Sequence, residues 1–175
     1  MTAQPPVPAI HGSCVALGAG GVLIRGRAGA GKSLLALVLL DHEPAGRLVA
    51  DDRVLVTAGP SGLVAAAPPA IAGLLELRGF GILRLPHVSP APIDLVVDLG
   101  NVGTAEGDGD EDRDGVHDGG DGRPPRLPTA AQRGVRLLGR RLPRLALPAV
   151  GAGLDFAAAA AAVRAALAFA PLATD

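Results

Sequence analysis

The chain has 175 residues with 16 basic and 17 acidic side chains, so its net charge at pH 7 is −1. This length suits one domain with an ordinary buried core, and the single cysteine excludes an internal disulfide framework. The start, MTAQPPVPAI, lacks the basic region and apolar run of a secretory signal, and Leu154–Ala170 is too polar and alanine-rich to span a membrane. We therefore expect a cytoplasmic protein with neither a membrane nor a nucleic acid as its partner.

The small net charge hides an uneven distribution of charged residues. Eight of the 17 acidic residues lie in Glu106–Gly122, which contains one basic residue. The rest of the chain carries 15 basic and nine acidic residues, and seven arginines fall between Arg123 and Arg144. Such a surface can attract acidic partners or phosphates, although a run of arginines is more often a solvated face.

The first half of the chain alternates apolar runs with glycine-rich turns. Residues 1–10 are rich in proline, so we expect a flexible tail followed by a single domain over residues 11–175. The runs SCVAL and GVLIR, separated by GAG, predict two strands joined by a tight turn. The second strand leads into GRAGAGKS, and SLLALVLLDH then predicts a helix. The run RLVA predicts a buried strand that ends at Asp51 and Asp52.

The second half predicts further strands and a closing helix. VLVTA and LVAAA flank GPSG as a hairpin, residues 68–86 combine a short helix with a glycine-bounded apolar stretch, and IDLVVDL reads as a strand. Residues 106–122 have too few apolar side chains to order themselves, so we expect a disordered acidic insertion. One or two short strands over 126–148 and a helix over Leu154–Ala170 complete an α/β domain, a mixed sheet with flanking helices.

The strongest functional signal is GRAGAGKS, which has the spacing G-x-x-x-x-G-K-S of a phosphate-binding P-loop. Its glycines let backbone N–H groups turn toward phosphate oxygens, its lysine can reach the β- and γ-phosphates, and its serine hydroxyl suits Mg²⁺. A predicted strand precedes the loop and a predicted helix follows it, as this function requires. The expected nucleotide-binding residues are Gly26, Arg27, Ala28, Gly29, Ala30, Gly31, Lys32 and Ser33.

Asp51 and Asp52 follow Lys32 by about one helix and one strand. In a parallel arrangement this spacing returns them to the sheet edge where the phosphates bind, and strand alternation predicts that one of the two faces the nucleotide. Motor and switch NTPases place more chain between the loop and the metal-linked acid. An acid that arrives this early can instead accept a proton from an incoming hydroxyl near the γ-phosphate. The alternative is that the two acids merely start a turn.

Four other features have plain interpretations when taken alone. His11 near the terminus would ordinarily be structural or solvated, Glu76 in LLELRGFGI would be solvated, and Cys14 would be a small buried apolar residue. Asp110–Asp121 has the acidic positions and the glycine of a calcium loop, but glycine- and proline-rich stretches stand where two helices should flank it. We interpret it as a solvated acidic linker.

Five segments together resemble the catalytic domain of HPr kinase/phosphorylase, the bacterial enzyme that acts on a serine of the phosphocarrier protein HPr. They cover most of residues 10–100 in the family's order and are HGSCVAL, GVLIRGRAGAGKS, LVADDRV, AAPPAIAGLLELRGFGI and IDLVVDL. LLELRGFGI is much more specific than the phosphate loop. The chain looks like the truncated proteobacterial form, which lacks the family's N-terminal domain.

The resemblance implies a core similar to that of phosphoenolpyruvate carboxykinase and an ATP- and Mg²⁺-dependent serine kinase in phosphotransferase-system regulation. It also implies the reverse reaction, in which phosphate attacks the phosphoserine and pyrophosphate is released. By this resemblance Lys32 would hold the transferring phosphates, Ser33 and Glu76 would bind Mg²⁺, and Asp52 would accept and return the serine proton.

The same resemblance places the family's active-site histidine at His11 and its late catalytic arginine at Arg126. Leu75–Leu83 would serve both directions, and Leu137–Pro148 resembles a shortened form of the segment linked to dephosphorylation. The implied partners are an HPr-like phosphocarrier and further copies of the chain in a hexamer.

Two other functions share part of this pattern. A small-molecule kinase or NTPase would explain the loop and Asp52, but not HGSCV together with LLELRGFGI. A nucleotide-sensing regulatory protein with decayed catalysis would be expected to have lost the acid or the lysine, and both Asp52 and Lys32 are present.

Overall fold

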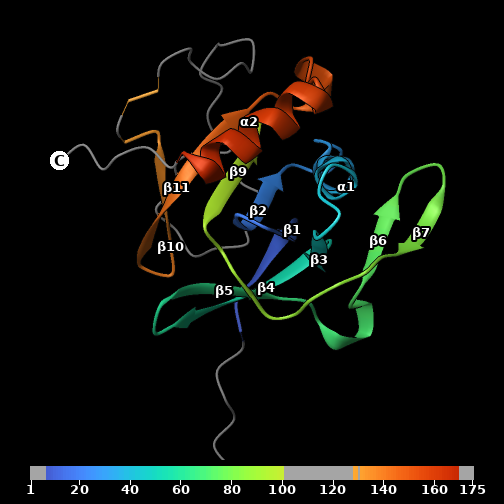
Figure 1. Cartoon of the computed structure of the whole chain (residues 1–175), viewed down its shortest axis with the longest axis horizontal. Helices are drawn as coiled ribbons and strands as arrows, with labels where there is room; N and C mark the ends of the chain where they lie inside the picture. The colour runs from blue at the N-terminus through green and yellow to red at the C-terminus, as the bar shows by residue number, and fades with distance from the viewer. Residues whose placement is uncertain (1–6, 101–127, 130, 170–175) are drawn as a thin grey trace, which may run out of the picture.

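The computed structural model describes residues 7–100, 128, 129 and 131–169. Within them a nine-stranded mixed sheet carries two helices on one face (Figure 1). The strand order is β10-β11-β9-β2-β1-β4-β5-β8. Strand β4 pairs with the first half of β1, and β3 pairs with its second half on the same side. The elements are β1 (Ala9–Leu17), β2 (Gly20–Gly26), α1 (Lys32–Asp41), β3 (Arg47–Ala50), β4 (Arg53–Gly59), β5 (Gly62–Ala66), β8 (Ala91–Pro92), β9 (Leu95–Leu99), β10 (Gly134–Leu137), β11 (Arg140–Leu147) and α2 (Phe156–Ala168).

Strands β2, β3, β9 and β11 all run in the same direction. β9 is parallel to β2 and to β11, whereas β2 and β3 are both antiparallel to β1. Their carboxyl ends therefore meet at one edge of the sheet. Residues 27–31 follow β2 at this edge, and Asp51 and Asp52 follow β3. Ligands of open α/β sheets bind at the carboxyl ends of the strands.

Apolar side chains fill both faces of the central strands, as expected for strands that are covered on two sides. On one face Ile24 and Val97 pack with Leu35 of α1 and Val163 of α2. On the other face the alternate strand residues pack against β4 and β5; this second cluster contains Cys14, Leu23, Val54, Leu63 and Val96. Burial raises the pKa of the Cys14 thiol to about 12, which agrees with its interpretation as a small apolar residue.

The two helices differ in how they begin. At α2 the Asp155 carboxylate accepts hydrogen bonds from the N–H groups of Ala157 and Ala158, at 2.9 and 3.1 Å, which is N-cap geometry. At α1 the N-cap is Gly31, which has no side chain to occupy the first turn. The first N–H groups of α1 therefore have no side-chain cap and can donate to an anion bound in the loop.

The hairpin β6–β7 stands apart from the main sheet, at the right of Figure 1. It consists of β6 (Leu74–Leu77) and β7 (Gly81–Arg84) and follows the short 3₁₀ helix η1 (Pro69–Ile71). The cross-strand pair Leu75 and Leu83 packs on the core beside α1, whereas the neighbouring pair Glu76 and Ile82 faces outward. Within residues 68–86 the expected helix is thus one 3₁₀ turn, and the apolar stretch is a hairpin.

The expected α/β architecture with a mixed sheet and flanking helices is confirmed. Strand β1 begins at Ala9 and pairs with β4, so the last two residues of the expected tail over 1–10 belong to the sheet. The acidic insertion over 106–122, with the calcium-like spacing inside it, lies outside the described residues. No helix in the part of the chain that the structure describes is long and apolar enough to cross a membrane.

Candidate functional site

The phosphate loop connects the carboxyl end of β2 to the amino end of α1. Gly29 and Gly31 have φ angles of +79° and +102°, which side chains rarely adopt, and the Ala30 N–H donates to the Arg27 carbonyl to close the turn. Val150, in the 3₁₀ helix η2 (Val150–Ala152), packs behind the loop, where its N–H donates to the Ala30 carbonyl at 3.2 Å. The loop is therefore a glycine turn between a strand and a helix, the context that GRAGAGKS predicts.

Lys32 is folded back over the loop. Its ammonium donates to the carbonyl oxygens of Gly26 and Arg27 at 2.9 and 3.0 Å, and the residue is 7% exposed. Burial lowers the pKa of Lys32, while the negative charges of Asp51 and Asp52 oppose this shift. An incoming phosphate would offer this ammonium a charged partner in place of two neutral carbonyls.

Asp51 is the buried member of the acid pair, at 5% exposure, and it accepts hydrogen bonds from three elements. The Ser33 hydroxyl of α1 lies 2.9 and 3.1 Å from its two carboxylate oxygens, and the Ser13 hydroxyl of β1 lies 2.5 Å from Oδ1. The Glu76 N–H of β6 donates to Oδ2 at 3.1 Å. Asp51 thus joins the phosphate loop, the central strand and the β6–β7 hairpin.

Asp52 has the opposite environment. Its backbone is in the left-handed region, at φ +65°, and its side chain is 68% exposed at the edge of the sheet. The His11 Nδ1 lies 3.2 Å from its carboxylate Oδ1 and 3.1 Å from its carbonyl oxygen, to which the Gly12 N–H also donates. A left-handed conformation is costly for a residue other than glycine, and these contacts hold it in place.

Glu76 and Arg78 reach the site from the β6–β7 hairpin. The Glu76 side chain is exposed beside Ile82, and its own N–H is fixed on Asp51. One guanidinium nitrogen of Arg78 lies 3.6 Å from the point where a side chain at Gly29 would begin. This segment is therefore part of the loop's surroundings and not a detached solvated element.

The structure brings His11, Lys32, Ser33, Asp52 and Glu76 to one edge of the sheet. Arg126 lies outside the described residues. Sequence reasoning missed the contacts of Asp51 and Ser13. The alternation of side chains along a strand predicted that Asp51 and Asp52 would face different ways. No sequence pattern indicated Ser13, because its contact with Asp51 depends on the pairing of β1 with β3.

The donors around the loop suit a magnesium ion that a nucleotide brings with it. They are the Ser33 hydroxyl and the carboxylates of Asp51 and Glu76, and hard oxygen ligands are those that Mg²⁺ prefers. Among residues 7–100, 128, 129 and 131–169, no group of three or more His, Cys, Asp or Glu side chains could hold a metal alone. Magnesium is commonly bound by one or two protein groups plus substrate phosphates, so the residues present fit that role.

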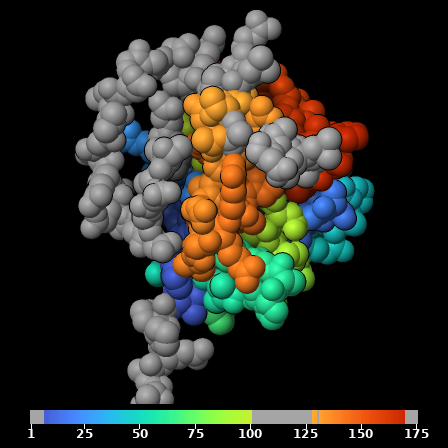
Figure 2. Space-filling view, turned by 90° about the vertical axis from the view of Figure 1, so that its left-hand side faces the viewer, coloured from blue at the N-terminus to red at the C-terminus, as the bar shows by residue number. Residues whose placement is uncertain are grey.

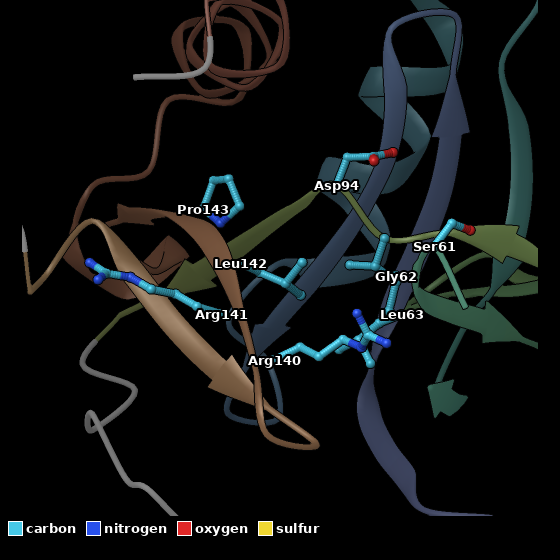
Figure 3. A pocket seen from close by; sticks show the side chains of 9 residues that line it. Ser61, Gly62, Leu63, Asp94, Arg140, Arg141, Leu142 and Pro143 are labelled. Carbon is cyan, nitrogen blue, oxygen red and sulfur yellow. The ribbon is translucent and has the colours of Figure 1, made fainter. Parts of the chain in front are cut away.

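A cleft of about 420 Å³ lies at the other end of the sheet. Asp94 lines it and precedes Leu95, which pairs with the start of β2, whereas the phosphate loop follows the end of β2. Figure 2 shows the β10–β11 hairpin, in orange, lying against the turn between β4 and β5. In Figure 3 Arg140 extends toward Gly62 and Leu63, and its guanidinium donates to the Gly59 carbonyl at 2.9 Å. The cleft is remote from the phosphate loop and is not part of the candidate site.

Several known proteins are similar to this chain in sequence. HPr kinase/phosphorylase of an Exiguobacterium species is 41% identical over 104 residues, covering 55% of this chain and 33% of the relative. The enzyme of the same name from a Geobacillus species is 42% identical over 102 residues, covering 54% and 32%. The chain therefore spans about a third of the length of the curated relatives that it matches.

The solved structure of the Hpr(Ser) kinase/phosphatase from Coxiella burnetii has the same fold. It superposes with a TM-score of 0.63 over 89% of this chain and 93% of that one, at 22% identity. Fold and loop together define an α/β domain with a P-loop at the carboxyl edge of its mixed sheet. The chain belongs to the family described as the HPr Serine kinase C-terminal domain, which matches residues 5–101.

Proposed function

We propose that this protein is an ATP- and Mg²⁺-dependent serine kinase whose substrate is an HPr-type phosphocarrier protein. The observation that carries the proposal is the exposed Asp52 carboxylate, held by His11 at the same sheet edge as the phosphate loop. A base for an incoming hydroxyl must be open to that hydroxyl, and a side chain that is 68% exposed satisfies this requirement. The names of the relatives supply the substrate class.

The positions of the residues support the following kinase step. The loop N–H groups and Lys32 hold the phosphates, while Mg²⁺ supplies positive charge against the phosphate oxygens. The serine Oγ bonds to the γ-phosphorus, the bond between that phosphorus and the ADP oxygen breaks, and the serine proton passes to Asp52. His11 keeps the Asp52 carboxylate in place, and Ser33 and Glu76 provide oxygen ligands beside the loop.

We propose that the same groups run the reverse reaction. Inorganic phosphate attacks the phosphoserine phosphorus, pyrophosphate forms, and Asp52 returns the proton to the serine oxygen. A carboxylate that both accepts and donates a proton suits a site that works in both directions. Arg126 remains a proposed catalytic residue on the family resemblance alone.

The proposal is tested by incubating the protein with Mg-ATP and a set of HPr-like phosphocarriers, then locating phosphoserine by mass spectrometry. We expect one serine of a carrier to be phosphorylated. ATP hydrolysis without transfer would favour the NTPase alternative, and nucleotide binding without turnover would favour the regulatory one. Adding phosphate to the phosphorylated carrier and assaying pyrophosphate tests the reverse reaction.

We propose a cytoplasmic setting, where ATP is available, with neither a nucleic acid nor a membrane as partner. The hexamer implied by the family resemblance also stays a prediction. Light scattering coupled to size-exclusion chromatography would check it, since a monomeric mass would contradict it.

A further inference from the structure

Ser13 occupies an unusual position for a polar residue in a central strand. It is fully buried in β1, between the apolar residues that line both faces of the sheet, and its hydroxyl lies 2.5 Å from the Asp51 Oδ1. This distance is typical of a charge-assisted O–H···O⁻ bond, which is stronger than a bond between neutral groups. Because a serine hydroxyl has one proton and Asp51 is an acceptor, Ser13 must donate.

The orientation of Asp51 determines what the Ser33 hydroxyl can do. Ser33 also has one proton and lies 2.9 and 3.1 Å from the two carboxylate oxygens. When it donates that proton to Asp51, both of its lone pairs face away from the carboxylate and are available to a metal ion. If the carboxylate turned away, the Ser33 hydroxyl could rotate and place its proton where the metal should be.

Asp51 would turn readily without specific partners, because the terminal torsion of an aspartate is broad and roughly two-fold. Two contacts besides Ser33 oppose this rotation. Ser13 holds Oδ1, and the Glu76 N–H holds Oδ2 at 3.1 Å. The Glu76 donor belongs to the separate β6–β7 hairpin, whereas Ser13 is fixed in the middle of the main sheet.

We propose that Ser13 is a positioning residue that orients Asp51, and through it the Ser33 hydroxyl, for the magnesium ion of a bound nucleotide. This inference rests on the proposed nucleotide-dependent function and assigns a residue to it that sequence reasoning did not identify. Ser13 acts through Asp51 and touches neither nucleotide nor metal. Its removal should therefore change how binding depends on magnesium more than it changes binding itself.

The test measures the affinity of a non-hydrolysable ATP analogue by calorimetry as Mg²⁺ is varied. For Ser13→Ala we expect the half-saturating Mg²⁺ concentration to rise by about tenfold, the scale of one lost hydrogen bond to a charged group. Affinity without metal should change by less than about twofold. Ser13→Cys keeps a weak donor, so its half-saturating Mg²⁺ concentration should lie between those of the unmutated protein and Ser13→Ala. The matched control is Ser89→Ala, which removes a hydroxyl that accepts from the Ala67 N–H away from the loop.

An unchanged magnesium dependence in Ser13→Ala would overturn the proposal. So would an equal loss of affinity with and without the metal, since that pattern indicates a structural role. A double-mutant cycle of Ser13→Ala and Ser33→Ala in chemical unfolding provides a readout that needs no nucleotide. Coupled effects would support the shared contact through Asp51, and additive effects would refute it. Failure of the unmutated protein to bind any nucleotide would refute the proposed function. The double-mutant cycle would still show whether Ser13 and Ser33 are coupled through Asp51.

Discussion

At the scale of single residues, Asp51 and Asp52 have opposite environments, and these suit the two different tasks that we propose for them. A carboxylate that must fix the Ser33 hydroxyl needs several donors and little water, and Asp51 has three donors at 5% exposure. A base must be open to its substrate, and the Asp52 side chain is 68% exposed. Asp52 also has a left-handed backbone conformation, with a φ of +65°.

Lys32 gives a pH prediction at this scale. Its pKa is lowered by burial, so between that lowered pKa and the ordinary 10.5 the folded state binds fewer protons than the unfolded state. Stability from this group therefore rises as the pH increases through that window. We expect the unmutated protein to gain stability relative to Lys32→Met over the window, as measured by urea unfolding at several pH values. A difference that stays constant or shrinks would contradict this account of Lys32.

At the scale of elements, the phosphate loop packs against η2 and the first residue of α2, near the carboxyl-terminal end of the described chain. A side chain at Gly31 would begin 2.6 Å from a methyl group of Val150 in η2 and 3.2 Å from the ring of Phe156, the first residue of α2. Because Gly31 also has a φ of +102°, it combines a close approach with a conformation that suits glycine. The loop and α2 are thus coupled by direct packing.

We predict that Gly31→Ala weakens nucleotide binding by at least about tenfold, because an alanine in the left-handed region costs roughly 1–2 kcal/mol before any clash is counted. The measurement is nucleotide affinity by calorimetry. Gly151→Ala is the control, since a side chain there would meet no atom within 4 Å. Equal affinities of Gly31→Ala and the unmutated protein would show that the loop does not depend on this packing.

Elements with a clear local pattern were predictable from the sequence. The β1–β2 pair, α1, β3 and β9 are short apolar runs bounded by glycine, proline or acids, and the structure has them close to the expected positions. The β6–β7 hairpin was less clear, because its outward pair is Glu76 with Ile82 and its turn residue Phe80 is 77% exposed. An apolar run normally indicates burial, so exposed apolar residues near a turn blur the alternation that marks a strand.

At the scale of the whole molecule, a buried ion cluster joins β2, β9 and β11. The Asp98 carboxylate, fully buried, accepts from Arg25 at 2.8 and 2.9 Å and from the Nε of Arg144 at 2.5 Å. The cluster ties three parallel strands together just before the edge that carries the phosphate loop. Arg144 belongs to the arginine-rich stretch that composition alone favoured as a solvated face, so this interpretation does not hold for Arg144.

Asp98→Asn should destabilise the protein by about 3–5 kcal/mol, because it removes the buried carboxylate charge that Arg25 and Arg144 both contact. Chemical unfolding measures this loss. Asp41→Asn, at the exposed end of α1, is the matched control and should change stability by no more than about 0.5 kcal/mol. A loss as small as that of the control would mean that the cluster does not hold the strands together.

The composition of the site was only partly predictable at this scale. Lys32 and Ser33 were found because they complete the P-loop spacing, and the acid pair was found because it directly follows β3. The order of the strands brings both to one edge of the sheet. The contacts that orient Asp51 were not predicted, because Ser13 lies 38 residues from Asp51 in the sequence and the Glu76 N–H lies 25 residues away. Such contacts arise from strand register and from the docking of the hairpin, which a single sequence does not reveal.

The most direct test of the central claim compares Asp52→Asn with Asp51→Asn in the phosphocarrier assay, with nucleotide affinity measured on the same samples. For Asp52→Asn we predict Mg-ATP affinity within about twofold of the unmutated protein and phosphoserine formation reduced by about 10²–10⁴-fold, the usual contribution of a general base. Asp51→Asn should instead lose magnesium-dependent nucleotide binding. Phosphoserine formation at the unmutated rate by Asp52→Asn would contradict the assignment of the base.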